Sequence, residues 1–121
     1  MHIAIASTWG PTDTTRATLP FLHARAAREQ GDDVTLMLLH DAVLLARDGV
    51  AEQIVAFGPP ALGPVFAELA GDDRVEILVC KPCVMVRQFG EAELRPGTRL
   101  ATMGDYHKAI RDNGATVANY G

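Results

Sequence analysis

The stretch Val75-Glu76-Ile77-Leu78-Val79-Cys80-Lys81-Pro82-Cys83 decides the fold that the sequence predicts. Its first part is nearly continuous in apolar residues, which is typical of a strand covered on both faces of a parallel sheet. Pro82 suits the first turn of a helix, because the N–H that proline lacks has no helical partner there. We therefore predict a strand that passes directly into a helix, with Cys80 at the junction and Cys83 one turn later. These are the only cysteines of the chain.

Apolar runs of the same kind recur along the 121 residues, and helical patterns lie between them. The predicted strands are His2–Ser7, 33–40, 74–80, 98–103 and 115–120. The predicted helices are 14–30, 42–47 with Asp41 as its cap, 61–70, 82–88 and 106–113. Pro20 is awkward inside the first helix and predicts a kink or a later start. Alternating strands and helices imply a three-layer α/β/α fold with flavodoxin-like layering and a five-stranded, mainly parallel sheet, formed as one domain over residues 1–121.

Composition narrows the classes of partner. The chain is 48% hydrophobic and 21% charged, with a net charge of −4, and its arginines are scattered rather than clustered. This pattern argues against nucleic acid as a partner, since phosphate binding needs a concentrated basic surface. The first residues do not resemble a signal peptide, and no apolar run approaches the roughly 20 residues that span a bilayer. We expect a cytoplasmic protein without membrane contact, in which a close cysteine pair is more often catalytic, redox-active or metal-binding than a structural disulfide.

The predicted sheet brings several polar segments to one edge. In open parallel sheets, ligands and catalytic groups gather at the carboxyl ends of the strands. We predict Cys80 and Cys83 as catalytic residues at this edge. The predicted binding residues are those that follow the first three strands, namely Thr8, Trp9, His40, Lys81 and Arg87.

The junction itself predicts an activated thiol. Unpaired N–H groups at a helix amino terminus stabilise an anion, and Lys81 and Arg87 add positive charge nearby. Both effects lower a thiol pKa, and we expect Cys80, at the junction, to feel them more than Cys83. The nucleophile of cysteine chemistry is the thiolate, so Cys80 is the predicted reaction centre.

Other interpretations of the same residues stay open. Cys80 can be a small hydrophobic residue that ends a core strand. A zinc site needs about four ligands, and the single cysteine pair has no histidines at ligand spacing. A thioredoxin-like dithiol shares the spacing but lacks the tryptophan and glycine that usually frame it. His40 can simply end a strand at the surface, Trp9 can serve in packing, and Thr8 can cap a turn. Glycine-rich phosphate loops are absent, and we predict no cofactor and no metal.

Four stretches together resemble the DsrE/DsrF-like family of small sulfur-relay proteins. These are residues 2–10, 31–43, 79–83 with Arg87 following, and 96–100. The resemblance implies a three-layer α/β fold, self-assembly into trimers or hexamers, and a cysteine that carries sulfur as a persulfide, which by position is Cys80. The chain departs from the family pattern at Gln88, where glycine is frequent, and at Cys83, which many relay members lack.

The residues and the resemblance together lead to three hypotheses. The first is a sulfur carrier or sulfurtransferase-like protein that accepts sulfane sulfur on Cys80 from a donor protein or small thiol and passes it to an acceptor. The second is a dithiol redox protein or sensor that uses Cys80 and Cys83. The third is a non-catalytic, oligomeric binding module of the same fold.

Overall fold

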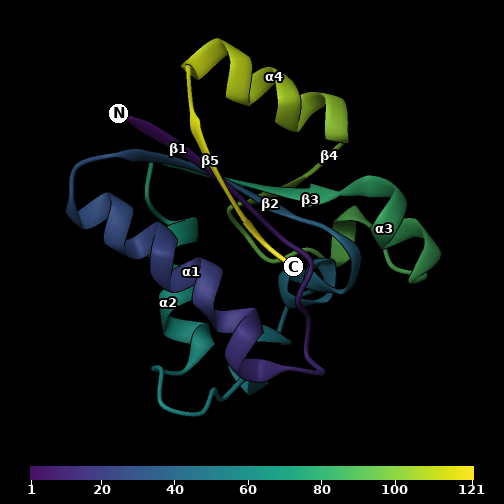
Figure 1. The fold of residues 1–121 in the computed structure, drawn as a ribbon. Helices are drawn as coiled ribbons and strands as arrows, with labels where there is room; N and C mark the ends of the chain where they lie inside the picture. Colours follow the sequence, from purple (N-terminus) through teal and green to yellow (C-terminus); the bar gives the residue numbers. More distant parts are fainter.

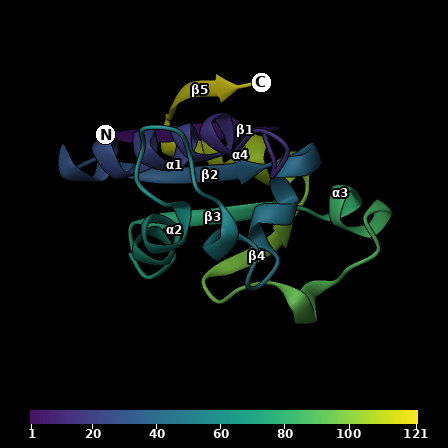
Figure 2. The same ribbon diagram turned by 90° about the horizontal axis from the view of Figure 1, so that it is seen from below.

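Five parallel strands form one sheet in the computed structural model, which describes all residues from 1 to 121. The sheet order is β4-β3-β2-β1-β5, and every neighbouring pair is parallel. Figure 2 shows this order, with β5 at one edge and β4 at the other. The strands are β1 (His2–Ser7), β2 (Asp33–Leu38), β3 (Val75–Cys80), β4 (Thr98–Ala101) and β5 (Thr116–Tyr120). The predicted α/β fold is confirmed.

The helices cover the two faces of the sheet unequally. Helices α1 and α2 pack on one face, whereas α4 alone packs on the other, over β1 and β2 (Figure 1). Helix α3 follows β3 without a break and lies beyond its carboxyl end. The α-helices are α1 (Thr14–Glu29), α2 (Leu62–Ala70), α3 (Lys81–Val86) and α4 (Met103–Asn113), and the 3-10 segments are η1 (His40–Ala46), η2 (Ala51–Gln53) and η3 (Glu91–Glu93). None of these helices is both long enough and apolar enough to cross a bilayer.

Several predicted elements differ in detail from the structure. The strand predicted at 98–103 is β4, which ends at Ala101 because α4 begins at Met103. The predicted helix at 42–47 is the 3-10 segment η1, which begins at His40, so β2 ends at Leu38 rather than at residue 40. Helix α4 begins three residues earlier than predicted, because Thr102 caps it through a reciprocal pair of hydrogen bonds with Asp105. Helix α1 begins at Thr14, so the later start suggested by Pro20 is wrong.

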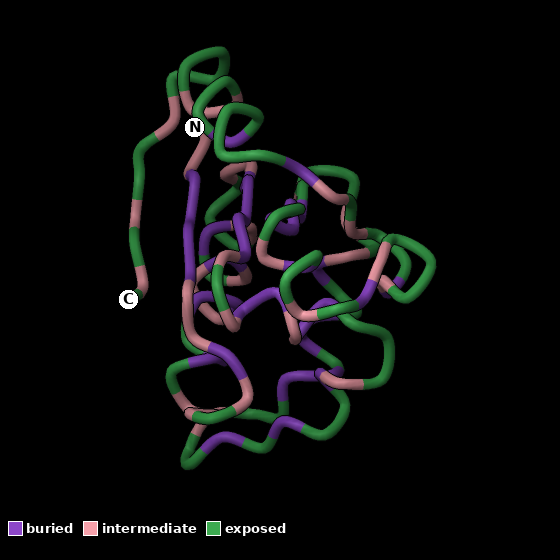
Figure 3. Tube along the Cα trace, turned by 90° about the vertical axis from the view of Figure 1, so that its right-hand side faces the viewer, coloured by how far each residue is buried: buried purple, intermediate pink, exposed green.

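The core lies between the sheet and the α1 and α2 helices. Phe21 of α1 and Phe66 of α2 are fully buried, and their ring centroids are 4.7 Å apart. Figure 3 shows buried residues concentrated along the central strands, whereas the trace of β5 is intermediate and exposed. Residues 34–38 of β2 and 77–80 of β3 are buried in succession, which explains their near-continuous apolar sequence, because side chains on both faces of these segments must leave water.

The strand register sets the position of the thiols. Ser7, Leu38 and Val79 lie in one row across β1, β2 and β3. Cys80 lies one residue beyond this row and pairs in register with Ala101 of β4. The carboxyl edge of the sheet therefore carries Cys80 at its rim, where the chain turns into α3.

Candidate functional site: a thiol pair at the carboxyl edge of the sheet

Cys80 and Cys83 form a close pair of free thiols. Cys80 ends β3 and is 7% exposed, whereas Cys83 lies in the first turn of α3 and is half-buried. Cys83 Sγ donates a hydrogen bond to Cys80 Sγ across 2.8 Å. The proximity follows from local sequence, because one helical turn after a strand end brings the third residue back over the junction. The structure has no group of three or more His, Cys, Asp or Glu side chains arranged around a metal position.

Burial controls the chemistry of Cys80. Removal from water raises the pKa of the Cys80 thiol, and the hydrogen bond with Cys83 raises it further, while the charge of Arg87 offsets only part of this. This direction is opposite to the activation that we expected for Cys80. Lys81, expected to lower that pKa, is exposed and makes no hydrogen bond or ion pair. The expectation failed because desolvation at the strand end outweighs positive charge in solvent.

A backbone amide faces the other sulfur. The N–H of His40 donates to Cys83 Sγ across 3.2 Å. His40 has a φ of 51°, in the left-handed region that residues other than glycine adopt uncommonly. The segment η1 begins at this strained residue, and the backbone conformation there directs the N–H of His40 toward the thiol pair.

Arg87 connects the thiol pair to the end of β2. Its Nε and Nη2 donate to Asp41 Oδ1 across 3.1 and 2.7 Å, and its Nη1 donates to the carbonyl oxygen of Cys83 across 3.0 Å. Nη2 also lies 3.1 Å from His40 Nδ1. Since a guanidinium only donates, Nδ1 must accept, and the proton of the neutral imidazole is on Nε2. Arg87 thus holds η1 and α3 together around the two thiols.

Asp41 was missed as a site residue. The hydrogen bond from Arg87 lowers the pKa of its carboxyl, and burial opposes this only in part. The sequence indicated Asp41 as a helix cap, but the side chain makes no capping bond in η1 and pairs with Arg87 instead. Its place beside His40 at a strand end was a signal, but the partner 46 residues away could not be identified from sequence.

Two predicted binding residues lie away from the thiols. Thr8 and Trp9 follow β1, which β2 separates from β3. The Thr8 hydroxyl donates to the carbonyl oxygen of Tyr120 across 3.5 Å, and the guanidinium of Arg16 lies 4.6 Å from the centroid of the Trp9 ring. Both residues therefore pack near the chain end after β5, while His40 and Arg87 do meet the thiols.

Gly10 gives the β1 loop an indirect connection to the site. It packs so closely on the backbone of Asp41 that a Cβ built on Gly10 would lie 2.7 Å from the carbonyl carbon and from the Cβ of Asp41. Only glycine permits this approach. The loop after β1 thereby supports the residue that holds Arg87.

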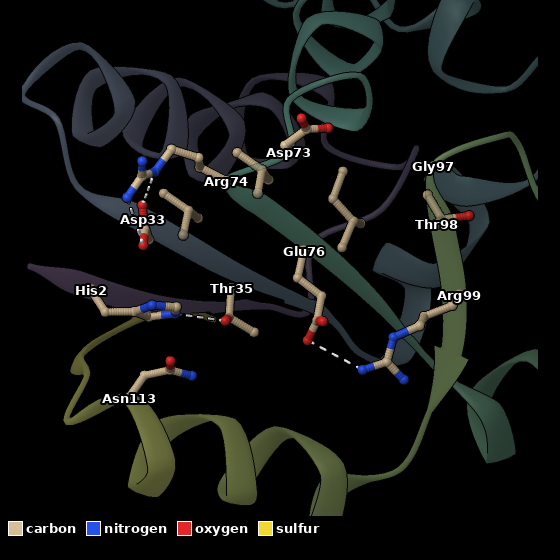
Figure 4. A pocket seen from close by; sticks show the side chains of 13 residues that line it. His2, Asp33, Thr35, Asp73, Arg74, Glu76, Gly97, Thr98, Arg99 and Asn113 are labelled. Carbon is tan, nitrogen blue, oxygen red and sulfur yellow. Dashed lines mark hydrogen bonds and ion pairs between the residues drawn. The ribbon is translucent and has the colours of Figure 1, made fainter.

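A cavity of about 590 Å³ lies at the opposite edge of the sheet (Figure 4). Both arginines that line it are paired with carboxylates, Arg74 with Asp33 across 2.6 Å and Arg99 with Glu76 across 3.2 Å. The cavity contains neither thiol, and its cations are already neutralised. Size alone does not identify this cavity as a reactive site, and we place the candidate site at the thiols.

Comparison with known proteins agrees with this fold. The model of the DsrE/DsrF-like family matches residues 1–118. The ychN protein from E. coli is similar in structure, with a TM-score of 0.76 and 21% identity over 99% of this chain and 100% of that chain. A protein of unknown function from Methanobacterium thermoautotrophicum, MTH1491, is similar with a TM-score of 0.74 and 13% identity over 98% and 97% of the two chains. At these identities the likeness to both structures is one of fold.

No curated protein matches the chain. The family match covers nearly the whole sequence and includes β3, both cysteines and Arg87. The chain therefore belongs to the DsrE/DsrF-like family.

Proposed function

We propose that this protein is a sulfur carrier that holds sulfane sulfur as a persulfide on Cys80 and passes it to an acceptor thiol. Membership of the DsrE/DsrF-like family suggests a sulfur-relay kind of function. The observation that carries the finer proposal is the pair of free thiols, 2.8 Å apart, at the carboxyl edge of β3 beside Arg87.

The proposed reaction is a balanced sulfur transfer. A cysteine thiolate attacks the outer sulfur of a donor persulfide, the donor leaves as a thiolate, and the cysteine becomes a persulfide. In the second half, an acceptor thiolate attacks the outer sulfur, and the cysteine thiolate is released. No oxidant is needed, because the sulfane sulfur keeps its oxidation state throughout. Rates depend on thiolate fraction, leaving group and access.

Arg87 supports both halves of this exchange. Its guanidinium lies close enough to the thiols to favour negative charge on Cys80, and Asp41 fixes its orientation. A persulfide that forms at this edge is an anion when deprotonated, and a fixed cation beside it stabilises that state. We expect donors and acceptors to be proteins or small thiols in a reducing cytoplasm, and the protein to assemble as a trimer or hexamer.

The short sulfur–sulfur distance favours a second candidate function. Cys83 thiolate can attack the inner sulfur of a Cys80 persulfide, which releases hydrosulfide and leaves a Cys80–Cys83 disulfide. A carrier must avoid this outcome, whereas a dithiol redox protein or sensor would use it. This second function predicts a reversible disulfide in place of a stable persulfide.

Intact mass spectrometry tests the proposal. Wild type, Cys80→Ser and Cys83→Ser are incubated to completion with inorganic polysulfide, freed of donor, and weighed. After brief exposure to a small thiol, a carrier still retains one sulfur of about 32 Da, which Cys80→Ser loses and Cys83→Ser keeps. A loss of two hydrogens that needs both cysteines supports the redox function. No mass change in any variant contradicts both and leaves a binding module.

A further inference from the structure

We propose that sulfur enters this protein on Cys83 and then moves inward to Cys80, so that the two cysteines form a relay within one chain. This inference rests on the proposed function and adds the direction of transfer. It assigns Cys83 as the residue that meets the donor and Cys80 as the residue that stores the sulfur.

The first argument is access. A donor persulfide must bring its outer sulfur into contact with the attacking sulfur, along the line of the bond that breaks. Cys80 is 7% exposed and packs within the hydrophobic core cluster, whereas Cys83 is half-buried at its margin. A donor therefore reaches Cys83 before Cys80.

The second argument concerns charge on the attacking sulfur. Cys83 Sγ accepts the N–H of His40, and this hydrogen bond supports the negative charge of an attacking or departing thiolate. The backbone N–H of Cys83 favours charge on Cys80 in the same way, but the hydrogen bond from the Cys83 side chain opposes it. Burial also raises the pKa of the Cys80 thiol, which lowers its fraction of thiolate at neutral pH. Cys83 is the better nucleophile toward an external donor.

The inward step becomes possible because the two sulfurs are neighbours, once rotation of the side chains places the outer sulfur in line between them. Cys80 sulfur attacks the outer sulfur of the Cys83 persulfide, the bond from that outer sulfur to Cys83 breaks, and Cys83 leaves as a thiolate. The proton that Cys80 gives up passes to the departing Cys83 sulfur, 2.8 Å away in the resting pair. The step is an isomerisation in which no atom or electron is gained or lost. It places the sulfane sulfur where solution thiols have the least access.

Time-resolved loading tests the direction. Wild type, Cys83→Ser and Cys80→Ala are mixed with inorganic polysulfide, quenched with an alkylating agent at intervals, digested with trypsin and fragmented in the mass spectrometer. Alanine is used at Cys80 because serine would add a buried hydroxyl. Lys81 precedes a proline, so trypsin leaves both cysteines in the peptide 75–87, and fragment ions between them locate the added sulfur.

In wild type we expect sulfur on Cys83 at early times and on Cys80 later. Cys83→Ser should load Cys80 at least about tenfold more slowly, and Cys80→Ala should still gain sulfur on Cys83 but lose it to added thiol. Equal initial rates in wild type and Cys83→Ser, or no gain in Cys80→Ala, would overturn the direction and leave the carrier function intact. If wild type gains no sulfur, both the direction and the carrier function fail. Cys83→Ala, loaded in parallel, separates the loss of the thiol from any effect of the serine hydroxyl.

Discussion

Replacement of Gly10 by alanine tests whether the β1 loop supports the thiol site. The added Cβ would lie within 2.7 Å of three atoms of Asp41, of which the carbonyl oxygen is the nearest, where ordinary contacts are 3.4–4 Å, so one segment must move by at least about 0.7 Å. The obstacle is mainly backbone, which no side-chain rotation removes. Overpacking of this kind costs about 1–3 kcal/mol, and we expect the upper half of that range.

Gly90 offers a matched control. It has a φ of −142°, which alanine adopts freely, and a Cβ built there meets nothing within 4 Å. Both substitutions reduce the entropy of the unfolded chain and gain about 0.4–1 kcal/mol from it. We therefore expect Gly10→Ala to be about 2 kcal/mol less stable than Gly90→Ala, a difference that contains the overpacking cost alone.

Urea unfolding at pH 7 measures this difference, and an NMR titration of Asp41 reports on the site. Arg87 lowers the pKa of the Asp41 carboxyl in the native protein. Displacement of Asp41 should weaken that pair and move the pKa back toward 3.8 in Gly10→Ala but not in Gly90→Ala. If the two variants are equally stable and titrate alike, the described contact between Gly10 and Asp41 is wrong.

Three further changes test separate contacts. Arg87→Met should lower the free energy of unfolding by about 1 kcal/mol at pH 7, given the solvent exposure of its pair with Asp41. Because the folded-state pKa of Asp41 is lowered, this difference should shrink as the pH falls below 3.8. A constant difference down to acid pH contradicts the ion pair. Phe21→Ala should cost about 3–5 kcal/mol by urea unfolding, since the ring is fully buried, and a cost below 1 kcal/mol would mean that the site collapses. Tyr120→Phe removes the hydrogen bond of 2.8 Å between the Tyr120 hydroxyl and His23 Nδ1. It should lower the free energy of unfolding by about 1 kcal/mol and speed amide hydrogen exchange in β5. Unchanged exchange would show that other contacts hold β5.

The sequence was sufficient for the fold because the fold depends on local patterns. Nearly continuous apolar runs predicted five strands, and the helical segments between them predicted the parallel sheet. The errors lie where side chains outside the segment decide the structure. Asp41 has the sequence of a helix cap, but the guanidinium of Arg87 binds it, and η1 forms in place of an α-helix.

The site was predicted in part for the same reason. Cys80 and Cys83 meet through one turn of local chain, which spacing alone reveals. The distance from Trp9 to the thiols depends on strand order, and β2 lies between β1 and β3. The pKa direction of Cys80 depends on burial, which no residue type encodes; the sequence shows the cation Lys81 beside it but not the loss of water around the sulfur.

The left-handed backbone of His40 separates two properties that usually change together. The amide that faces Cys83 belongs to the main chain, whereas the imidazole that faces Arg87 belongs to the side chain. Glycine adopts a φ of 51° at no steric cost, so His40→Gly removes the ring, keeps the amide in place and relieves strain. A β-branched residue at this position would also remove the ring, but it would disturb the amide as well, because its backbone disfavours this region. Substitutions at residue 40 therefore distinguish whether the thiol pair depends on the backbone amide or on the imidazole ring.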